Sequence, residues 1–202
     1  MPAPWHHQGE TALIRKITVG AYENNVYVVA CATTGKAVIV DAAFEPDRIA
    51  VAVTDVEPIA ILTTHGHFDH VGAAADTAQR LGIPFRLHPA DAGIAGMTPD
   101  EPLHPGPIQV GDLTIGARHT PGHTPGSLCF VVPGVVMSGD TLFPGGPGAT
   151  SSAHSSFPTI IASIATGLFT LDEATLVMPG HGLDTTIGTE RPALDQWRER
   201  GW

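Results

Sequence analysis

The chain has 202 residues, of which 43% are apolar, so it is long enough to form one compact domain with a buried core. Ten lysines and arginines stand against twenty aspartates and glutamates. The resulting net charge of −10 disfavours nucleic acid as a partner, because a phosphate backbone would be repelled. The N-terminal "MPAPWHHQGE" has no basic segment followed by an apolar one, and no apolar run reaches transmembrane length, so we expect a cytoplasmic protein without a membrane partner.

The first half of the chain predicts short strands followed by helices. Three β-branched runs, each bounded by Gly, Asn or Thr-Gly, predict strands: 14–19, 25–30 and 36–41. A helix is expected over 45–54, which has a proline in its first turn. The run at 59–64 shows no polar alternation, which is typical of a strand buried on both faces. The Ala-rich segment 70–82, which ends at Gly82, predicts a second helix.

The second half repeats this theme. Four apolar runs predict strands: 113–119, 127–132, 134–140 and 174–180. A helix with a strong apolar face is expected over 156–171, and a terminal helix or turn over 190–202. Two similar halves, roughly 1–105 and 106–202, therefore predict a single α/β domain in which sheet packs on sheet and helices lie outside.

Residues that suit metal ions follow four of these strands. The strand at 59–64 runs into "HGHFDH", and the strand at 113–119 runs into "TPGHTPGS". The strand at 134–140 ends on "SGD", and the strand at 174–180 is followed by "HG". Loops at strand carboxyl ends converge on one edge of a scaffold, so four segments that are distant in the sequence can meet in one place.

The chemistry of these residues fits two metal ions. Imidazole and carboxylate suit zinc and other first-row divalent cations, and the chain has no set of thiolates that would indicate a structural zinc cluster. His65 and His67 lie on the same side of an extended segment, while Asp69 and His70 point to a neighbouring position. Asp140 is suited to bridge two cations together with a hydroxide. The alternative is a chance polar turn before a helix, which four such motifs in this order disfavour.

From "ENNVYVVA" to "PGHGLDTTIGTERP" the chain resembles hydrolases of the metallo-β-lactamase fold, of the short glyoxalase II-like type. The resemblance implies a four-layer αβ/βα sandwich with two divalent cations at one edge; zinc is favoured, with iron and manganese as alternatives. It assigns the ligands by motif, with His65, His67 and His123 on the first cation, Asp69, His70 and His181 on the second, and Asp140 between them. Asp41 matches an aspartate of the family's first motif that braces the histidine loop.

The resemblance implies a thioesterase that cleaves a small acyl thioester with a metal-bound hydroxide, with Asp69 and Asp140 as catalytic residues. Asp140 stands where the best-known β-lactamases of this fold have Cys or Ser, which disfavours β-lactams, whereas "SGDTLF" and "TPGHTPGS" resemble glyoxalase II. A persulfide dioxygenase with a single iron and a lactonase are the enzymatic alternatives. A metal-binding relic of the fold is the non-enzyme alternative, against which the complete ligand set argues.

The expected partner is a small-molecule acyl thioester. Full-length glyoxalase II enzymes bind glutathione largely through a C-terminal helical domain, whereas this chain has 21 residues after His181 and only two lysines, Lys16 and Lys36. We therefore expect a relaxed preference for the thiol. The Gly/Ser-rich segment 141–157, which carries His154, is expected to be a solvated loop, with a substrate-binding loop as the alternative. Phe68 either lines the pocket or packs beneath its loop. Association into a homo-oligomer stays open.

Overall fold

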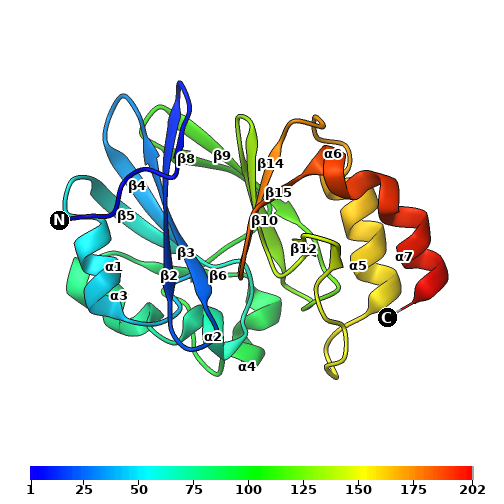
Figure 1. Ribbon diagram of the computed structural model, residues 1–202. Helices are drawn as coiled ribbons and strands as arrows, with labels where there is room; N and C mark the ends of the chain where they lie inside the picture. The colour runs from blue at the N-terminus through cyan, green and yellow to red at the C-terminus, as the bar shows by residue number, and fades with distance from the viewer. Residues whose placement is uncertain (202) are drawn as a thin grey trace.

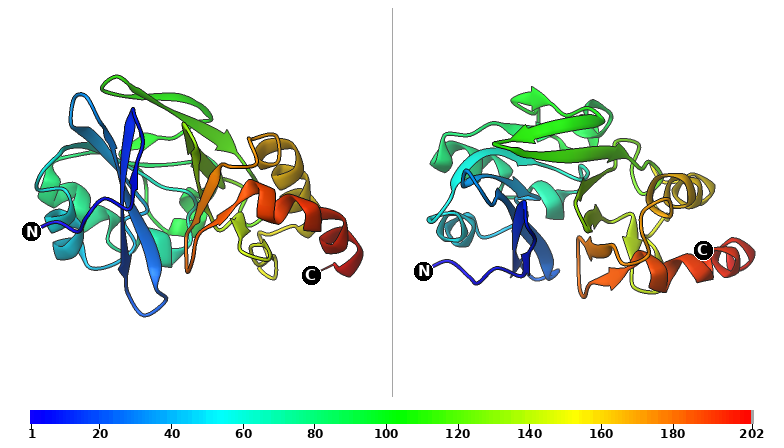
Figure 2. Two further views of the ribbon diagram at one scale, coloured as in Figure 1. Left: turned by 45° about the horizontal axis from the view of Figure 1, so that its top comes forward. Right: turned by 90° about the horizontal axis from the view of Figure 1, so that it is seen from above.

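Two β-sheets pack face to face in the middle of the molecule, and helices cover the outer face of each sheet (Figure 1). The computed structural model describes residues 1–201. Seen from above, the helices of the first half and those of the second half lie on opposite sides of the paired sheets (Figure 2). This arrangement is the four-layer αβ/βα sandwich that the sequence predicted.

The first sheet has its strands in sequence order. They are β1 (His7–Gln8), β2 (Ala12–Val19), β3 (Asn24–Cys31), β4 (Lys36–Val40), β5 (Glu57–Leu62), β6 (Phe85–Leu87) and β7 (Glu101–Pro102). Pairing is antiparallel from β1 to β4 and parallel from β4 to β7. The inner position of β5 confirms the expectation from its apolar run, and its last three residues are fully buried.

The second sheet is formed by the second half of the chain. Its order is β15 (Thr185–Thr186), β14 (Leu176–Pro179), β11 (Val135–Gly139), β10 (Leu128–Val132), β9 (Leu113–His119) and β8 (Gly106–Val110). A small hairpin of β12 (Leu142–Phe143) and β13 (Gly146–Pro147) follows β11. The pair β11 and β14 is parallel, as is β4 with β5 in the first sheet, so the carboxyl ends of these strands lie at the same edge of their sheets.

The helices are short. The first half has α1 (Pro46–Ala52), α2 (Phe68–Val71), α3 (Ala74–Leu81), η1 (Pro89–Asp91) and α4 (Ala92–Ala95). The second half has α5 (Phe157–Ser163), a π-helical turn η2 (Ile164–Leu168), α6 (Ile187–Glu190), η3 (Arg191–Ala193) and α7 (Leu194–Arg200). Apolar side chains fill three layers: one between the two sheets, one beneath α1 and α3, and one beneath α5 and α7.

Two of the expected helices are wrong in detail. The segment 70–82 is two helices, α2 and α3, that are separated at Gly72 and Ala73. At this break, Gly72 packs so closely on the chain that a Cβ would lie 2.8 Å from the Ala43 carbonyl oxygen, and the Ala73 N–H donates to the Ala42 carbonyl outside the helix. The terminal helix of 190–202 is divided into α6, η3 and α7, and residue 202 lies outside the described residues. The predicted end at Gly82 is confirmed, since Gly82 closes α3 in the left-handed conformation.

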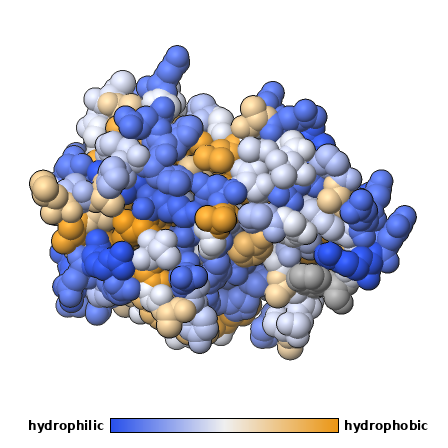
Figure 3. All heavy atoms as spheres, viewed as in Figure 1, coloured by the Kyte–Doolittle hydropathy of each residue, from blue (hydrophilic) through white to orange (hydrophobic). Residues whose placement is uncertain are grey.

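The surface of the molecule is mainly polar. The face shown in Figure 3 is largely hydrophilic, and apolar side chains reach it in small separate patches. Among the described residues, no helix has both the length and the apolar character needed to cross a bilayer.

Candidate metal centre

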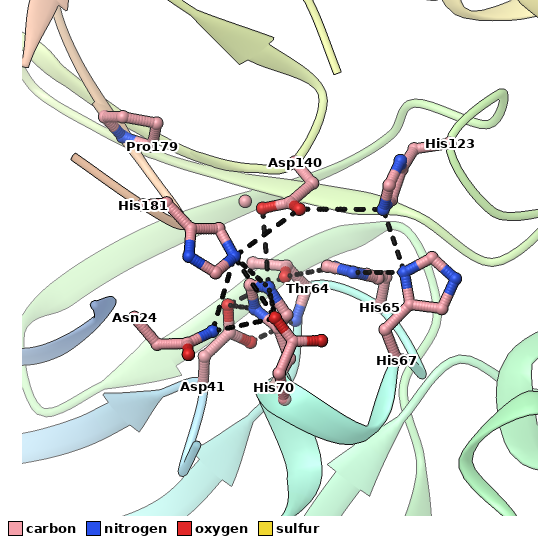
Figure 4. Close-up of polar contacts among 12 residues, drawn as sticks. Asn24, Asp41, Thr64, His65, His67, His70, His123, Asp140, Pro179 and His181 are labelled. Carbon is pink, nitrogen blue, oxygen red and sulfur yellow. Dashed lines mark hydrogen bonds and ion pairs between the residues drawn. The ribbon is translucent and has the colours of Figure 1, made fainter. Parts of the chain in front are cut away.

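The seven residues assigned to metal binding meet at one edge of the sandwich (Figure 4). Each follows the carboxyl end of a strand: β5 leads to the "HGHFDH" turn, β9 to His123, β11 to Asp140 and β14 to His181. In Figure 4, His181 lies on one side of Asp140, and His123 and His67 lie on the other. The structure thus brings together all seven side chains that the motifs singled out.

Three imidazoles form the first group. Nδ1 of His67 lies 3.1 Å from Nε2 of His65 and 2.9 Å from Nε2 of His123. One ring nitrogen can donate only one proton, so these three nitrogens cannot all be satisfied by each other. In a tetrahedral zinc site with Zn–N bonds of about 2.0–2.1 Å, neighbouring donor atoms lie about 3.3 Å apart. The spacing of the three nitrogens fits ligands that share one cation.

Asp69, His70 and His181 form the second group. Nε2 of His181 lies 3.3 Å from Nε2 of His70 and 3.2 Å from Oδ2 of Asp69. The distance between His70 Nε2 and Asp69 Oδ2 is 3.6 Å. These distances suit a second cation site in which one of the three ligands is a carboxylate.

Asp140 lies between the two groups. Its Oδ1 is 3.4 Å from His70 Nε2, and its Oδ2 is 3.6 Å from His123 Nε2 and 3.7 Å from His181 Nε2. Oδ1 is buried and has no hydrogen-bond partner among residues 1–201. A buried carboxylate oxygen without such a partner is costly unless a cation compensates it. Asp140 thus fits the position of a ligand shared by two cations.

The outer nitrogens of four histidines are held by acceptors. Nδ1 of His123 donates to the Ala149 carbonyl at 2.7 Å, and Nδ1 of His181 donates to the Tyr22 carbonyl at 2.8 Å. Nδ1 of His70 lies 2.9 Å from Oδ2 of Asp41. Nδ1 of His65 lies 3.0 Å from the Thr64 hydroxyl. Each contact places the imidazole proton on Nδ1 and leaves the Nε2 lone pair directed into the cluster, as a metal ligand requires.

Burial and neighbouring charges shift the pKa values of the clustered histidines in different directions. Burial, together with the neighbouring histidines, holds the pKa of His65 well below its ordinary value, so this imidazole is neutral. Burial also lowers the pKa of His67. Burial opposes protonation of His70, but Asp140 and Asp41 outweigh it and raise the pKa of His70. Burial raises the pKa of Asp69 less than His181 and His70 lower it, so Asp69 is ionised.

Asp41 lies behind the histidine turn, as the sequence predicted. Its Oδ1 accepts from the backbone N–H of Thr64 at 2.7 Å, and its Oδ2 accepts from the Thr64 hydroxyl at 2.8 Å. Its backbone adopts φ 59°, a left-handed conformation that is uncommon outside glycine. Asp41 therefore fixes both Thr64 and His70, and through Thr64 it orients His65.

Two residues of this region were not expected from the sequence. Asn24, at the start of β3, donates from Nδ2 to Oδ2 of Asp69 at 3.1 Å, and its backbone pairs with His181 as an isolated bridge. Asp91 is fully buried beneath the "HGHFDH" turn. Asn24 stands at the start of the strand run "NNVYVVA". At such a position an asparagine is typical of a turn and does not indicate a site residue. No motif marks Asp91.

Aromatic side chains lie beside the second group. The ring of Phe68 is 61% exposed and that of Tyr22 is 58% exposed, and they pack edge to face with centroids 5.6 Å apart. Phe44 supports both rings at centroid distances of 6.4 Å. Phe44 in turn packs on Gly20, where a Cβ would lie 2.3 Å from the Phe44 ring. The ring of Phe68 thus packs on Tyr22 and Phe44 and remains exposed to solvent.

The segment after Asp140 is partly ordered by the hairpin of β12 and β13 and reaches the cluster through Ala149, whose carbonyl holds His123. His154 lies further along, with its side chain exposed and its backbone N–H donating to the Ser152 hydroxyl. The structure brings His154 into none of the groups of metal-ligand side chains. His119, four residues before His123, stacks on the ring of His88 with centroids 5.0 Å apart.

The fold and this edge site agree with the comparisons with known proteins. Residues 19–181 match the family model of the metallo-beta-lactamase superfamily, and the chain belongs to this superfamily. It is 35% identical over 202 residues to the probable metallo-hydrolase YqgX of Bacillus subtilis, covering 88% of this chain and 93% of that protein. It is 32% identical over 178 residues to hydroxyacylglutathione hydrolase GloC of Haemophilus influenzae, covering 77% and 84%. The protein is a metallo-hydrolase of this superfamily.

Two solved structures share the fold closely. The BLEG-1 B3 metallo-beta-lactamase superposes with a TM-score of 0.80 at 31% identity, covering 89% of this chain and 96% of that chain. TTHA1623, whose structure was solved in a di-iron-bound form, superposes with a TM-score of 0.79 at 34% identity, covering 88% and 96%.

Proposed function

We propose that this metallo-hydrolase is a thioesterase of the glyoxalase II-like type, which cleaves a small acyl thioester at a centre of two divalent cations. The observation that carries the proposal is the shared position of Asp140 between two groups of inward-facing donor atoms. His65, His67 and His123 would hold one cation, and Asp69, His70 and His181 the other. A di-iron form of TTHA1623 and the hydroxyacylglutathione hydrolase GloC support two metals and a thioester.

When bound, the two cations would supply a water with its pKa lowered toward about 7 and a positive field for a developing oxyanion. The chain's own residues position the reaction. Asp140 holds the two halves of the site together from β11, and Asp41 keeps the His70 and His65 rings in one orientation. Asn24 fixes one oxygen of Asp69.

Asp69 carries the proton transfer. Its carboxylate is ionised, and its side chain is 16% exposed at the mouth of the cluster. It orients the attacking water, whose oxygen forms the new C–O bond as the C–S bond breaks. The proton released from the water passes through Asp69 to the departing thiolate, so that the products are one carboxylic acid and one thiol. No serine or cysteine nucleophile is needed.

The aromatic rings of Tyr22 and Phe68 support a substrate with an apolar acyl group. They are exposed beside Asp69 and His181. A substrate whose scissile carbonyl lies near Asp140 would therefore have one of its ends close to these two rings. Thiols that carry acyl groups in solution are polar, so the apolar surface suits the acyl end. Lys16 is already engaged beside the His181 loop, where its Nζ donates to the Gly182 carbonyl and pairs with Asp184, and Lys36 begins β4 on the surface. This distribution disfavours a tight clamp on an anionic thiol.

A β-lactam is the second candidate substrate, because of the 31% identity to a B3 metallo-beta-lactamase. A lactone, and a persulfide oxidised at a single iron, are further alternatives for the same donor set. A metal-binding relic is disfavoured because all seven predicted ligands are present and face one another.

The experiment is a parallel assay of the zinc-loaded and iron-loaded protein. Hydrolysis is measured for lactoyl thioesters of glutathione and of smaller, less charged thiols, and for a β-lactam and a lactone. For a persulfide, the uptake of oxygen is measured. We expect thioester hydrolysis with a high KM for the glutathione ester and lower KM values for the less charged esters, because binding remote from the reacting carbonyl is what the site lacks. A micromolar KM for the glutathione ester alone would refute the relaxed preference. Hydrolysis of the β-lactam or consumption of oxygen without thioester cleavage would refute the reaction.

A further inference from the structure

Asp91 is a buried carboxylate that lies between two of the loops carrying candidate ligands. It ends η1, after β6 and before α4, and its side chain is completely buried. No ion pair joins it to a lysine or arginine within residues 1–201. A carboxylate in such a position is costly unless its oxygens are bonded and a positive charge lies near. Its surroundings therefore have to explain its presence.

Both oxygens of Asp91 are bonded to the two loops that supply the three-imidazole group. Oδ2 accepts from the backbone N–H of Gly66, which stands between His65 and His67, at 2.9 Å. The same oxygen accepts from the hydroxyl of Thr124, the residue after His123, at 2.6 Å. Oδ1 accepts from the backbone N–H of Gly126 at 2.6 Å. One side chain thus joins the loop after β5, in the first sheet, to the loop after β9, in the second sheet.

The glycines of these two motifs make room for Asp91. A Cβ on Gly66 would lie 2.6 Å from the Asp91 carbonyl oxygen and 3.0 Å from the Asp91 Cβ. A Cβ on Gly126 would lie 2.7 Å from Cγ and from Oδ1 of Asp91. Neither glycine has a left-handed φ, so the requirement at these positions is space rather than backbone conformation. The glycines of the "HGH" and "TPGS" motifs therefore leave the space that Asp91 occupies beside the candidate ligands.

The negative charge of Asp91 would favour a cation at the three-imidazole group. The first group contains only imidazole ligands, which bring no charge to a cation, whereas the second group includes the carboxylate of Asp69. A buried negative charge directly beneath the loop of His65 and His67 offsets part of the positive charge of a cation held there. The cation in turn offsets the cost of burying Asp91. This reciprocity explains a buried carboxylate that has no ion pair with an arginine or lysine.

We propose that Asp91 is the positioning residue of the three-imidazole site: it sets the distance between the two ligand loops and raises the affinity of this site for its cation. The inference rests on the metal centre proposed above, but it concerns binding and not the reaction. Residues behind metal ligands commonly contribute 10–100-fold to metal affinity. We therefore expect Asp91→Asn to weaken one of two zinc sites by about 10–100-fold and to leave the other within about 2-fold.

The test is a zinc titration of the full chain against a chromophoric chelator, with Asp91→Asn in two backgrounds. His123→Ala removes a ligand of the three-imidazole site, and adding Asp91→Asn should then change the remaining site by less than about 2-fold, since distant effects are independent. His181→Ala removes a ligand of the other site, and adding Asp91→Asn should then weaken the remaining site by the full factor. Equal weakening in both backgrounds, or no weakening in either, would overturn the proposal.

Two further variants keep the result interpretable. Asp100 is an exposed aspartate that accepts from the backbone N–H of Phe85, far from the ligand loops, and Asp100→Asn should leave both zinc sites unchanged. If Asp91→Asn does not fold, Thr124→Val removes one of the three hydrogen bonds to Asp91, and about 3–10-fold weakening confined to the same site is expected. No selective weakening by Thr124→Val would then overturn the proposal. Two intact zinc sites without thioesterase activity would refute the proposed reaction and leave the role of Asp91 standing.

Discussion

The two groups of candidate ligands are built from different chemistry. His65, His67 and His123 are all imidazoles, and their loops come from two sheets that Asp91 joins. The second group contains a carboxylate, Asp69, and its members are held by Asp41, by Asn24 and by the Tyr22 carbonyl.

The second group is also closer to solvent. The His181 side chain is 26% exposed, whereas His123 is 9% exposed and His65 is almost completely buried. The aromatic rings of Phe68 and Tyr22 lie on this same side. The comparison teaches that the first group is the more enclosed, with only His67 partly exposed, while Asp69 and His181 of the second group are partly exposed on the side from which we expect a substrate to approach. Substitution of a residue shared by both groups, of a residue that acts on one group, and of a residue at the edge of the site should therefore affect the protein to different extents.

Asp140 belongs to both groups, and its removal should have the largest effect. Asp140→Ala should lower the affinity for both cations and reduce kcat/KM by about 10³-fold or more, because a loss of several kcal/mol of transition-state stabilisation corresponds to that factor. His154→Ala, from the exposed segment after β13, is the control and should keep full metal content, with any change confined to substrate kinetics. Elemental analysis and steady-state kinetics measure both. Full metal and full rate in Asp140→Ala would show that the ligand assignment is wrong.

Asp41 acts mainly on the second group, through His70. Asp41→Ala should lower the free energy of unfolding of the metal-free protein by about 3 kcal/mol, because it removes a buried partner of His70 and Thr64. Asp41→Asn should be less damaging by about 1 kcal/mol, since asparagine tolerates the left-handed backbone at this position and alanine does not. Chemical denaturation of both variants measures the difference. Equal stability of the two variants would show that the backbone conformation contributes nothing.

Phe68 tests whether the exposed side of the site meets the substrate. Phe68→Ala should raise KM for thioesters with apolar acyl groups by about tenfold, equivalent to 1.4 kcal/mol, with kcat nearly unchanged. For a lactoyl thioester the change should be small. Val51→Ala, at another exposed apolar side chain on α1, is the matched control. An equal rise in KM for apolar and polar acyl groups would remove Phe68 from substrate recognition.

The convergence of the seven candidate ligands could be expected from the sequence because each follows an apolar strand within a short motif. Their spacing, His-x-His followed by Asp-His, carries the chemistry in the sequence itself. The role expected of Asp41, which follows the run "KAVIV", came from the resemblance to the family's first motif.

Other features depend on packing between distant segments. Asp91 meets Gly66 and Gly126 across separations of 25 and 35 residues, and no local pattern marks those contacts. Strand β8 begins with Gly106 and Pro107, which are typical of a turn. The sequence therefore predicted neither this strand nor its pairing with β9. The break between α2 and α3 coincides with the packing of Gly72 and Ala73 on the chain at Ala42 and Ala43, while the helical pattern of 70–82 is continuous. Such features follow from tertiary contacts that override local propensity.

Metal content tests the central claim most directly. The gently purified chain, saturated with zinc and freed of loosely bound metal, should contain close to two metal ions per chain, while Asp140→Ala should contain fewer. Elemental analysis against protein concentration gives the number, and an oxygen-uptake assay on the same sample tests the alternative reaction. Two ions per chain with thioester hydrolysis and no oxygen uptake is the predicted result. A reproducible single iron per chain, with the second group of ligands failing to bind at saturating metal, would contradict a shared centre at Asp140.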